Sequence, residues 1–207
     1  MISVTRDTFR LAEVFTIARG SRTEAQVLTV RITDGGVTGW GECVPYARYA
    51  ETLDSVTAQI EALPVPVSRA ALYEHLPAGA ARNAVDCALW DLEAKQAGVR
   101  VWDLIGVPQP EPQITAYTLS LDTPEKMEAQ AAQNSHRPVL KIKLGTPDDM
   151  PRLEAVRRGA PKAQIIVEAT EGWSPEVYAD LAPHLLRLGV QLVEQPLPAS
   201  EDGALIG

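Results

Sequence analysis

Four charged side chains at the ends of predicted strands could carry out acid–base and metal chemistry. Lys141 and Lys143 stand one residue apart in the run "LKIKLG", and Glu168 and Glu194 lie near the ends of two later apolar runs. Side chains alternate across a strand, so we expect both lysines to point to the same side. Neighbouring ammonium groups repel, and burial adds to the effect, so we expect one lysine to have a lowered pKa and to act as a base. The two carboxylates offer the oxygen ligands that a divalent cation prefers.

The spacing of these residues favours a functional interpretation over a structural one. A KxK pair on a strand more often lies on an exposed edge, and a glutamate that ends a strand is usually a solvated loop residue or a helix cap. Here, however, positions 143, 168 and 194 are separated by 25 and 26 residues and fall at the same depth of consecutive strand–helix units. We therefore expect Lys141, Lys143, Glu168 and Glu194 to form one site.

The second part of the chain, residues 111–207, alternates strands with helices. Helix-length segments such as 149–159 and 174–189 separate four apolar, β-branched runs, which we expect to be strands at 113–121, 137–145, 163–170 and 189–196. The strands begin 24 to 26 residues apart, near the roughly 30 residues of one unit of a (β/α)8 barrel, whose active sites lie at the carboxyl ends of the strands. The sequence thus predicts an incomplete α/β barrel with about the first four βα units.

The first part of the chain, residues 1–110, has a different rhythm. A DGG turn joins the last two of its short alternating runs, which cover 10–18, 24–33 and 37–43. Helical periodicity begins near Ser55 and is clearest before Gly98. These patterns predict an α+β domain, and the proline-bearing stretch 107–113 is the expected linker.

Composition excludes several classes of partner. The chain has 19 Lys and Arg against 27 Asp and Glu, a formal net charge of -8, and no basic cluster, so we expect no nucleic-acid partner. Cys43 and Cys87 lie far apart, without the spacing of a zinc or redox site. The sequence shows neither a signal peptide nor a membrane span, so a cytoplasmic location without membrane association is expected.

Several motifs together resemble a known enzyme family. The KxK of "LKIKLG", "VEATEGW" at 167–173 and "LVEQPLP" at 192–198 are similar to the muconate-lactonizing branch of the enolase superfamily. Longer segments, which resemble those of dipeptide (L-Ala-D/L-Glu) epimerases, are "IARGSRTEA", "GWGECVPYARYAET" and "LPAGAARNAVDCALWDLEAK". The resemblance implies an α+β capping domain followed by a modified (β/α)8 barrel, and an isomerase that acts on small acidic dipeptides from cell-wall recycling.

The resemblance also implies a role for each candidate residue. Lys143 would be the base that removes the α-proton of the dipeptide's C-terminal residue, with Lys141 lowering its pKa and lying near the substrate carboxylate. Glu168 and Glu194 fall on positions that bind Mg2+, which stabilises the enediolate. Arg19 and Arg22, in "ARGSR", would pair with an acidic side chain of the substrate, although a solvated loop accounts for them equally well.

Two features differ from the family pattern. The third strand usually reads Asp-Ala-Asn, whereas here it reads Glu168-Ala169-Thr170. A third carboxylate ligand on the fifth strand and a lysine on the sixth have no counterpart in four βα units, so this chain is expected to be incomplete for catalysis. Open alternatives are a muconate cycloisomerase, an o-succinylbenzoate synthase, and an inert fragment or a half-barrel that associates into a homo-oligomer.

Overall fold

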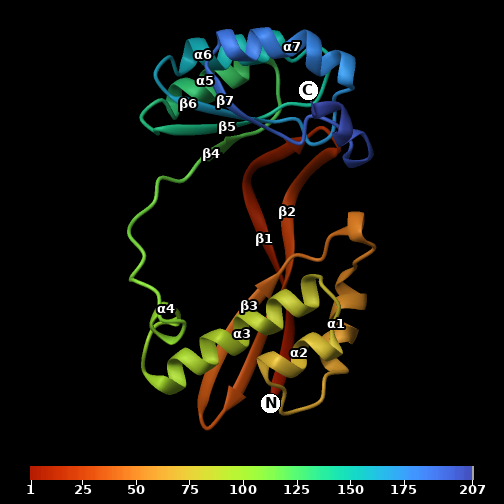
Figure 1. The fold of residues 1–207 in the computed structure, drawn as a ribbon, viewed down its shortest axis with the longest axis vertical. Coiled ribbons are helices and arrows are strands. Elements are labelled where there is room, and N and C mark those ends of the chain that lie inside the picture. Colours follow the sequence, from red (N-terminus) through yellow and green to blue (C-terminus); the bar gives the residue numbers. More distant parts are fainter. Residues whose placement is uncertain (207) are drawn as a thin grey trace. The chain divides into compact units, whose positions relative to one another are not determined.

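A computed structural model describes residues 1–206 of the protein, which form two compact units (Figure 1). The first unit comprises residues 1–10 and 24–111, and the second comprises residues 11–23 and the chain from Pro112 onward. The expected division of the chain into domains 1–110 and 111–207 stays a prediction. What the structure adds is that residues 11–23 pack with the second unit.

The first unit contains a three-stranded sheet with the order β1-β2-β3. Its strands are β1 (Ile2–Ile17), β2 (Gly20–Asp34) and β3 (Val37–Cys43). Strands β2 and β3 are antiparallel, and Asp34 pairs with Val37. The two glycines between them have φ angles of 56° and 79°, a left-handed conformation that glycine adopts without steric cost. The predicted DGG hairpin is therefore confirmed.

Helix α3 covers β3 at very short range. The helices of this unit are η1 (Ala47–Tyr49), α1 (Leu53–Glu61), α2 (Arg69–His75), α3 (Ala80–Ala97) and α4 (Val101–Leu104). A Cβ atom added at Gly39 or Gly41 would lie 2.1 or 2.0 Å from a backbone oxygen of α3. Only glycine permits this approach, which explains the "GWGE" motif. The apolar side of α3 joins the core of this unit through Ala84, Val85 and Ala88.

The second unit contains a parallel sheet with the order β4-β5-β6-β7. Its elements are β4 (Tyr117–Leu119), α5 (Pro124–Gln133), β5 (Val139–Lys143), α6 (Met150–Gly159), β6 (Gln164–Glu168), α7 (Pro175–Arg187), β7 (Val190–Glu194) and η2 (Ala199–Leu205). The predicted order of strands and helices is confirmed. Strand β4 is shorter than the expected 113–121, because its register with β5 runs from Tyr117, opposite Leu140, to Leu119, opposite Ile142.

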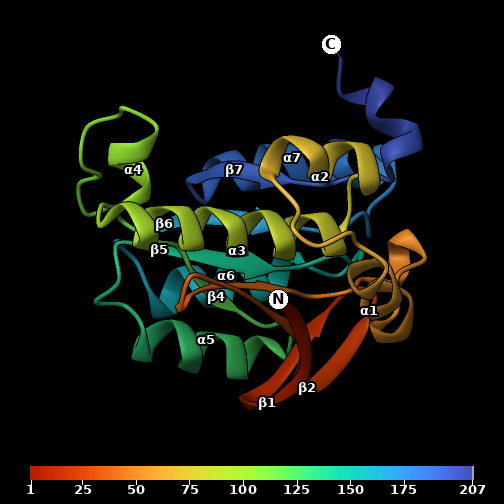
Figure 2. The same ribbon diagram turned by 90° about the horizontal axis from the view of Figure 1, so that it is seen from below.

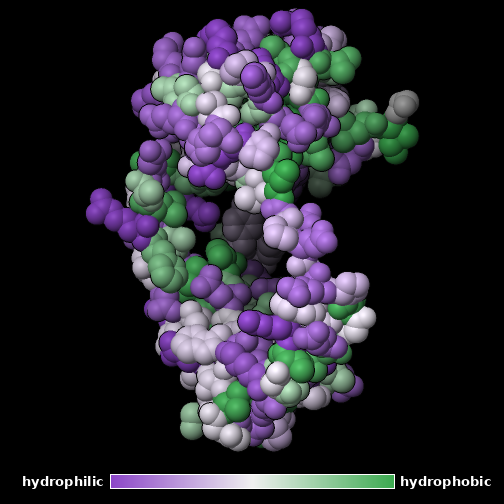
Figure 3. Space-filling model, turned by 90° about the vertical axis from the view of Figure 1, so that its left-hand side faces the viewer, coloured by the Kyte–Doolittle hydropathy of each residue, from purple (hydrophilic) through white to green (hydrophobic). Residues whose placement is uncertain are grey.

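Helices α5, α6 and α7 lie on one face of this sheet and follow the order of the strands (Figures 1 and 2). Leu140, Ile142, Ile165 and Val167 pack with these helices in one buried core. Hydrophilic side chains gather over the outer side of the helical layer, at the top of Figure 3. Because the core residues of the strands face the helices, the alternate strand residues must point to the other face of the sheet. None of the helices in residues 1–206 is long and apolar enough to cross a membrane.

Candidate active site

Lys143, Glu168 and Glu194 lie side by side across three neighbouring strands. In the parallel register, Lys143 of β5 is the partner of Glu168 of β6, which is in turn the partner of Glu194 of β7. Each residue is the last of its strand, so all three lie at the carboxyl end of the sheet. Lys141 precedes Lys143 by two residues and projects from the same side of β5, away from the helices.

The four side chains form a connected group of ion pairs. Lys141 Nζ lies 2.5 Å from Glu168 Oε2 and 2.6 Å from Glu194 Oε2, and Lys143 Nζ also pairs with Glu168 Oε2. Glu168 and Lys143 are buried, with 7% and 9% of their surfaces exposed, whereas the side chain of Glu194 is 42% exposed. The two positive and two negative charges balance, so the buried part of the group carries compensated charge.

The ion pairs change the pKa values from those that two lysines alone would have. Burial by itself would lower the pKa of Lys141, but hydrogen bonds to Glu168 and Glu194 outweigh it and raise the pKa. Lys141 is therefore not the lysine with a lowered pKa, because a carboxylate lies between the two ammonium groups. Burial would likewise raise the pKa of Glu168, but the two lysines outweigh it and hold that pKa below its usual value.

The backbone just beyond these strand ends is strained. Thr170, Glu171 and Gln195 are not glycines, yet their φ angles are 55°, 62° and 47°. Residues in this left-handed region cost free energy and persist where surrounding contacts hold them, which is common at functional sites. Here the N–H of Glu171 donates to the carbonyl oxygen of Gln195 at 2.8 Å, which joins the loops that follow β6 and β7.

The turn between β1 and β2 brings both candidate arginines to the same unit as the lysines. Arg19 donates to the carbonyl oxygen of Thr170 at 3.1 Å and pairs with Glu171 at 3.3 Å. The Arg22 guanidinium lies 5.5 Å from the centre of the Phe15 ring, and Lys143 Nζ lies 5.8 Å from the same centre. Phe15 therefore lies close to both the predicted base and Arg22.

The carboxylates fit magnesium in kind, as part of a ligand set. One ammonium group, that of Lys141, receives both Glu168 and Glu194, so the two carboxylates converge on a single cation. Magnesium is commonly held by one or two carboxylates, with water and substrate oxygens as the other ligands. No cluster of three or more His, Cys, Asp or Glu side chains suited to a metal occurs in residues 1–206. The described residues would thus supply two ligands.

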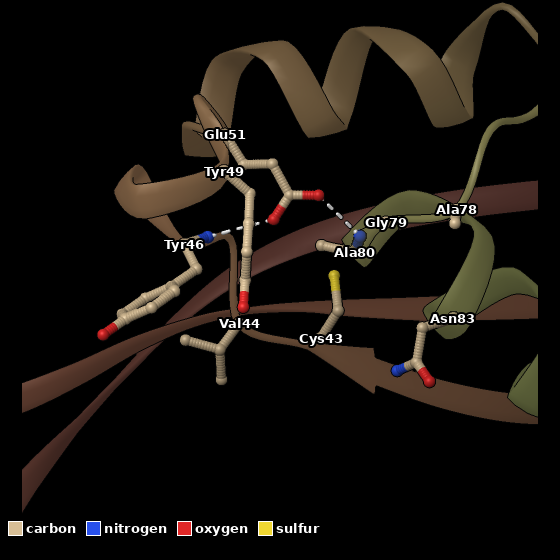
Figure 4. A pocket seen from close by; sticks show the side chains of 9 residues that line it. All are labelled: Cys43, Val44, Tyr46, Tyr49, Glu51, Ala78, Gly79, Ala80 and Asn83. Atoms are coloured by element: carbon tan, nitrogen blue, oxygen red, sulfur yellow. Dashed lines mark hydrogen bonds between the residues drawn. The ribbon is translucent and has the colours of Figure 1, made fainter. Parts of the chain in front are cut away.

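The first unit contains a separate open pocket of about 510 Å³. It lies between the segment 43–51 and the start of α3 (Figure 4). The carboxylate of Glu51 bridges the two sides, because it accepts hydrogen bonds from the N–H of Tyr46 at 3.1 Å and of Ala80 at 2.7 Å. Glu51 thereby occupies the N-terminus of α3, where a negative charge is favourable.

Comparison with models of protein families identifies the family to which the chain belongs. Residues 1–106 match the model of the mandelate racemase/muconate lactonizing enzyme N-terminal domain, and residues 125–205 match the enolase C-terminal domain-like model. The chain belongs to the mandelate racemase/muconate lactonizing enzyme family. Its first unit thus corresponds to the β-rich capping domain of this enolase-superfamily fold, and its second to part of the barrel.

Members of this family that resemble the chain include dipeptide epimerases. The L-Ala-D/L-Glu epimerase of Escherichia coli strain K12 is 44% identical over 99% of this chain. An Agrobacterium tumefaciens enolase family member with homology to dipeptide epimerases, solved with sodium and L-Ala-L-Glu, is 49% identical over 99% of the chain, with a TM-score of 0.95. A Cytophaga hutchinsonii dipeptide epimerase with Mg and D-Ala-L-Val is 27% identical over 99% of the chain, with a TM-score of 0.89.

The chain spans less than two thirds of these proteins. It covers 65% of the Escherichia coli relative, 64% of the Agrobacterium protein and 60% of the Cytophaga protein. The parallel sheet of four strands is consistent with part of a barrel.

Several residues of this family member near the site were not predicted from the sequence. Glu171 and Phe15 contact the candidate arginines, and buried Asp149 binds the loop that follows Lys143. Glu171 lies within the quoted "VEATEGW" motif, so its position could have marked it. Phe15 and Asp149 carry no such signal, because their contacts depend on tertiary structure.

Proposed function

We propose that the protein is a dipeptide epimerase, an isomerase that inverts the Cα of the glutamate in L-Ala-Glu. The observation that carries this proposal is the convergence of two lysines and two carboxylates at the carboxyl ends of β5, β6 and β7. The similarity to relatives named dipeptide epimerases supports the choice of reaction. Because the chain spans only part of these relatives, the proposal concerns the full-length protein.

Lys143 is the proposed base that takes the α-proton. Its amine can accept a proton only in the neutral form. Lys141 lies on the same side of β5 as Lys143, where its ammonium group can pair with the substrate carboxylate beside the base. Lys126, which pairs with Asp122, and Lys162, which precedes β6, do not join this group of ion pairs, so neither is proposed as the group that returns the proton.

Glu168 and Glu194 would hold the magnesium ion. When bound, the ion would offset the negative charge that develops on the substrate carboxylate as the α-proton leaves. Replacement of the usual aspartate by Glu168 lengthens one ligand arm by a methylene. Glu168 and Glu194 are direct partners on the neighbouring strands β6 and β7, so both carboxylates can reach one cation.

Arg22 is the proposed partner of the glutamate side chain of the substrate. It is exposed, and it lies over the Phe15 ring that also lies near Lys143. Arg19 is the second candidate, and substrate binding there would compete with its pairing to Glu171. A role in the cytoplasmic recycling of cell-wall peptides would follow from such a substrate and belongs to the same proposal.

The test is epimerisation of L-Ala-L-Glu by the full-length protein with magnesium, followed by chiral chromatography. Exchange of the α-proton for deuterium, followed by NMR, reports proton abstraction separately. Lys143→Ala should abolish both signals, whereas the matched control Lys162→Ala, at an exposed position, should leave both unchanged. Substantial turnover by Lys143→Ala would remove Lys143 from the mechanism. An inactive wild-type protein would overturn the proposed function.

A further inference from the structure

Asp149 is a buried carboxylate to which the proposed reaction gives no role. It is 1% exposed and lies in the loop between β5 and α6. Its Oδ2 atom accepts hydrogen bonds from the backbone N–H groups of Gly145 and Thr146, both at 2.7 Å, and from Trp173 Nε1 at 2.9 Å. Thr146 follows Lys143 by three residues, and Trp173 follows Glu168 by five, so one carboxylate joins the loops of the proposed base and the proposed ligand.

Arg152 extends this connection to a third loop. Its Nη1 donates to Asp149 Oδ1 and to Thr146 Oγ1, at 3.1 and 2.9 Å, and its Nε donates to the carbonyl oxygen of Asp122 at 2.9 Å. Asp122 lies just beyond β4, so the loops after three consecutive strands are bonded to the Asp149–Arg152 pair. Hydrogen bonds that involve charged groups are stronger than neutral ones, which makes this an effective anchor.

The same loops touch one another and the β1–β2 turn without room for adjustment. A Cβ atom at Gly172 would lie 2.3 Å from the carbonyl oxygen of Gly145. A Cβ atom at Gly145 would lie 2.4 Å from the carbonyl oxygen of Ala169 and 2.6 Å from the Cβ of Ala18. A shift of the loop held by Asp149 would therefore be passed to the end of β6 and to the turn that carries the two arginines.

We propose that Asp149 is a positioning residue, which fixes the loops after β4, β5 and β6 and thereby holds Lys143 opposite the Cα of the substrate. The kinetic part of this proposal rests on the proposed function. Misplacement of a reacting group by about 1 Å can cost roughly a hundredfold in rate, so an anchor of this kind has a large effect without touching the substrate.

Asparagine is the informative replacement because it keeps the shape and removes the charge. Oδ2 of Asp149 accepts only from N–H donors, whereas Oδ1 accepts from Arg152 Nη1 and, at 2.8 Å, from the Thr146 hydroxyl, which itself accepts from Arg152. Either orientation of an amide therefore turns its NH2 group toward at least one N–H donor. The matched control is Asp148→Asn, which removes the same charge from the neighbouring exposed position.

The first measurement is hydrogen exchange in the full-length protein. We expect Asp149→Asn to speed amide exchange in segments 144–147 and 170–174 by at least about tenfold, with unchanged exchange in the first unit. Trp173→Phe, which loses only the indole donor, should give a smaller increase and provides the test if Asp149→Asn does not fold. Exchange in both variants equal to that of Asp148→Asn would overturn the proposal.

The second measurement is epimerisation kinetics. We expect Asp149→Asn to lower kcat roughly 10- to 100-fold with little change in KM, and Asp148→Asn to match the wild type. Faster exchange with an unchanged kcat would show that Asp149 serves the fold alone and would overturn its positioning role. A wild-type protein that does not epimerise would contradict the proposed function instead, and the exchange data would still decide whether Asp149 fixes the loops.

Discussion

Replacement of Glu168 by glutamine should strongly destabilise the second unit. The carboxylate is buried and receives the ammonium groups of Lys141 and Lys143, whose side chains are 23% and 11% exposed. Without it, Lys141 still has Glu194, whereas Lys143 loses its only ion pair within residues 1–206. Removing one partner of a buried pair costs about 3 to 5 kcal/mol, and we expect about 3 kcal/mol because the lysines are partly exposed.

A second substitution tests whether unbalanced charge is the cause. Lys143→Met alone leaves Glu168 paired with Lys141, so we expect a cost of only about 1 kcal/mol. The double variant restores charge balance through the Lys141–Glu194 pair, and we expect a total cost of about 2 kcal/mol rather than the additive 4 kcal/mol. Additive costs would refute the reasoning, since the two side chains would then contribute independently.

The assay must report on one unit, because a chain with two units need not unfold in a single step. Amide exchange in β5 and β6 measures the free energy of local opening. A difference of about 2 kcal/mol corresponds to roughly 30-fold in the exchange rate, which is readily measured.

The effect of pH gives the same reasoning a sign. The pKa of Glu168 is held below its usual value of 4.5, so its pairing stabilises the fold above about pH 4.5 and is lost as the pH falls through the lowered pKa. The difference between wild type and Glu168→Gln, each corrected for intrinsic exchange, should therefore be full at neutral pH and shrink on acidification. A difference that is constant down to pH 3 would contradict the pairing.

Three other predictions concern packing, thiol reactivity and the metal. Gly41→Ala should destabilise the first unit by about 3 kcal/mol, at the upper end of the cost of overpacking, because the added Cβ would lie 2.0 Å from a backbone oxygen of α3. The assay is urea denaturation followed by circular dichroism, and the control is Gly203→Ala, whose added Cβ would meet open space. Burial, together with the nearby charges of Glu51 and Glu42, raises the pKa of the Cys43 thiol to about 11. The exposed Cys87 should therefore react first with a thiol reagent at pH 8, and equal rates would show that Cys43 is accessible. Glu168→Asp in the full-length protein should tighten magnesium binding in calorimetry, and weaker binding would show that the backbone has adapted to glutamate.

The sequence was informative wherever a local pattern determined the structure. Alternation placed Lys141 and Lys143 on one side of β5, and the spacing of 25 and 26 residues placed Glu168 and Glu194 beside them. The DGG turn was equally local. Each of these follows from strand geometry and from the rule that parallel strands end at the same edge of a sheet.

Contacts between distant parts of the chain could not be predicted in this way. The carboxylate of Glu168 lies between the two lysines, so the repulsion expected from the KxK spacing alone does not lower the pKa of Lys141. Arg19 meets Glu171 across 152 positions of sequence, and Asp149 meets Trp173 across 24. No periodicity or motif encodes such pairings, because they arise only when separate elements pack together.

The packing of residues 11–23 with the second unit has a consequence for recombination between relatives. A crossover in the linker near residues 107–113 would exchange the whole N-terminal portion and carry the β1–β2 turn with it. The residues that this turn contacts, around Gly145 and Thr170, would come from the other parent. Chimaeras made at this obvious junction would inherit the arginines of one parent and the loops that receive them from the other. A compatible chimaera therefore requires residues 11–23 and the barrel to come from the same parent.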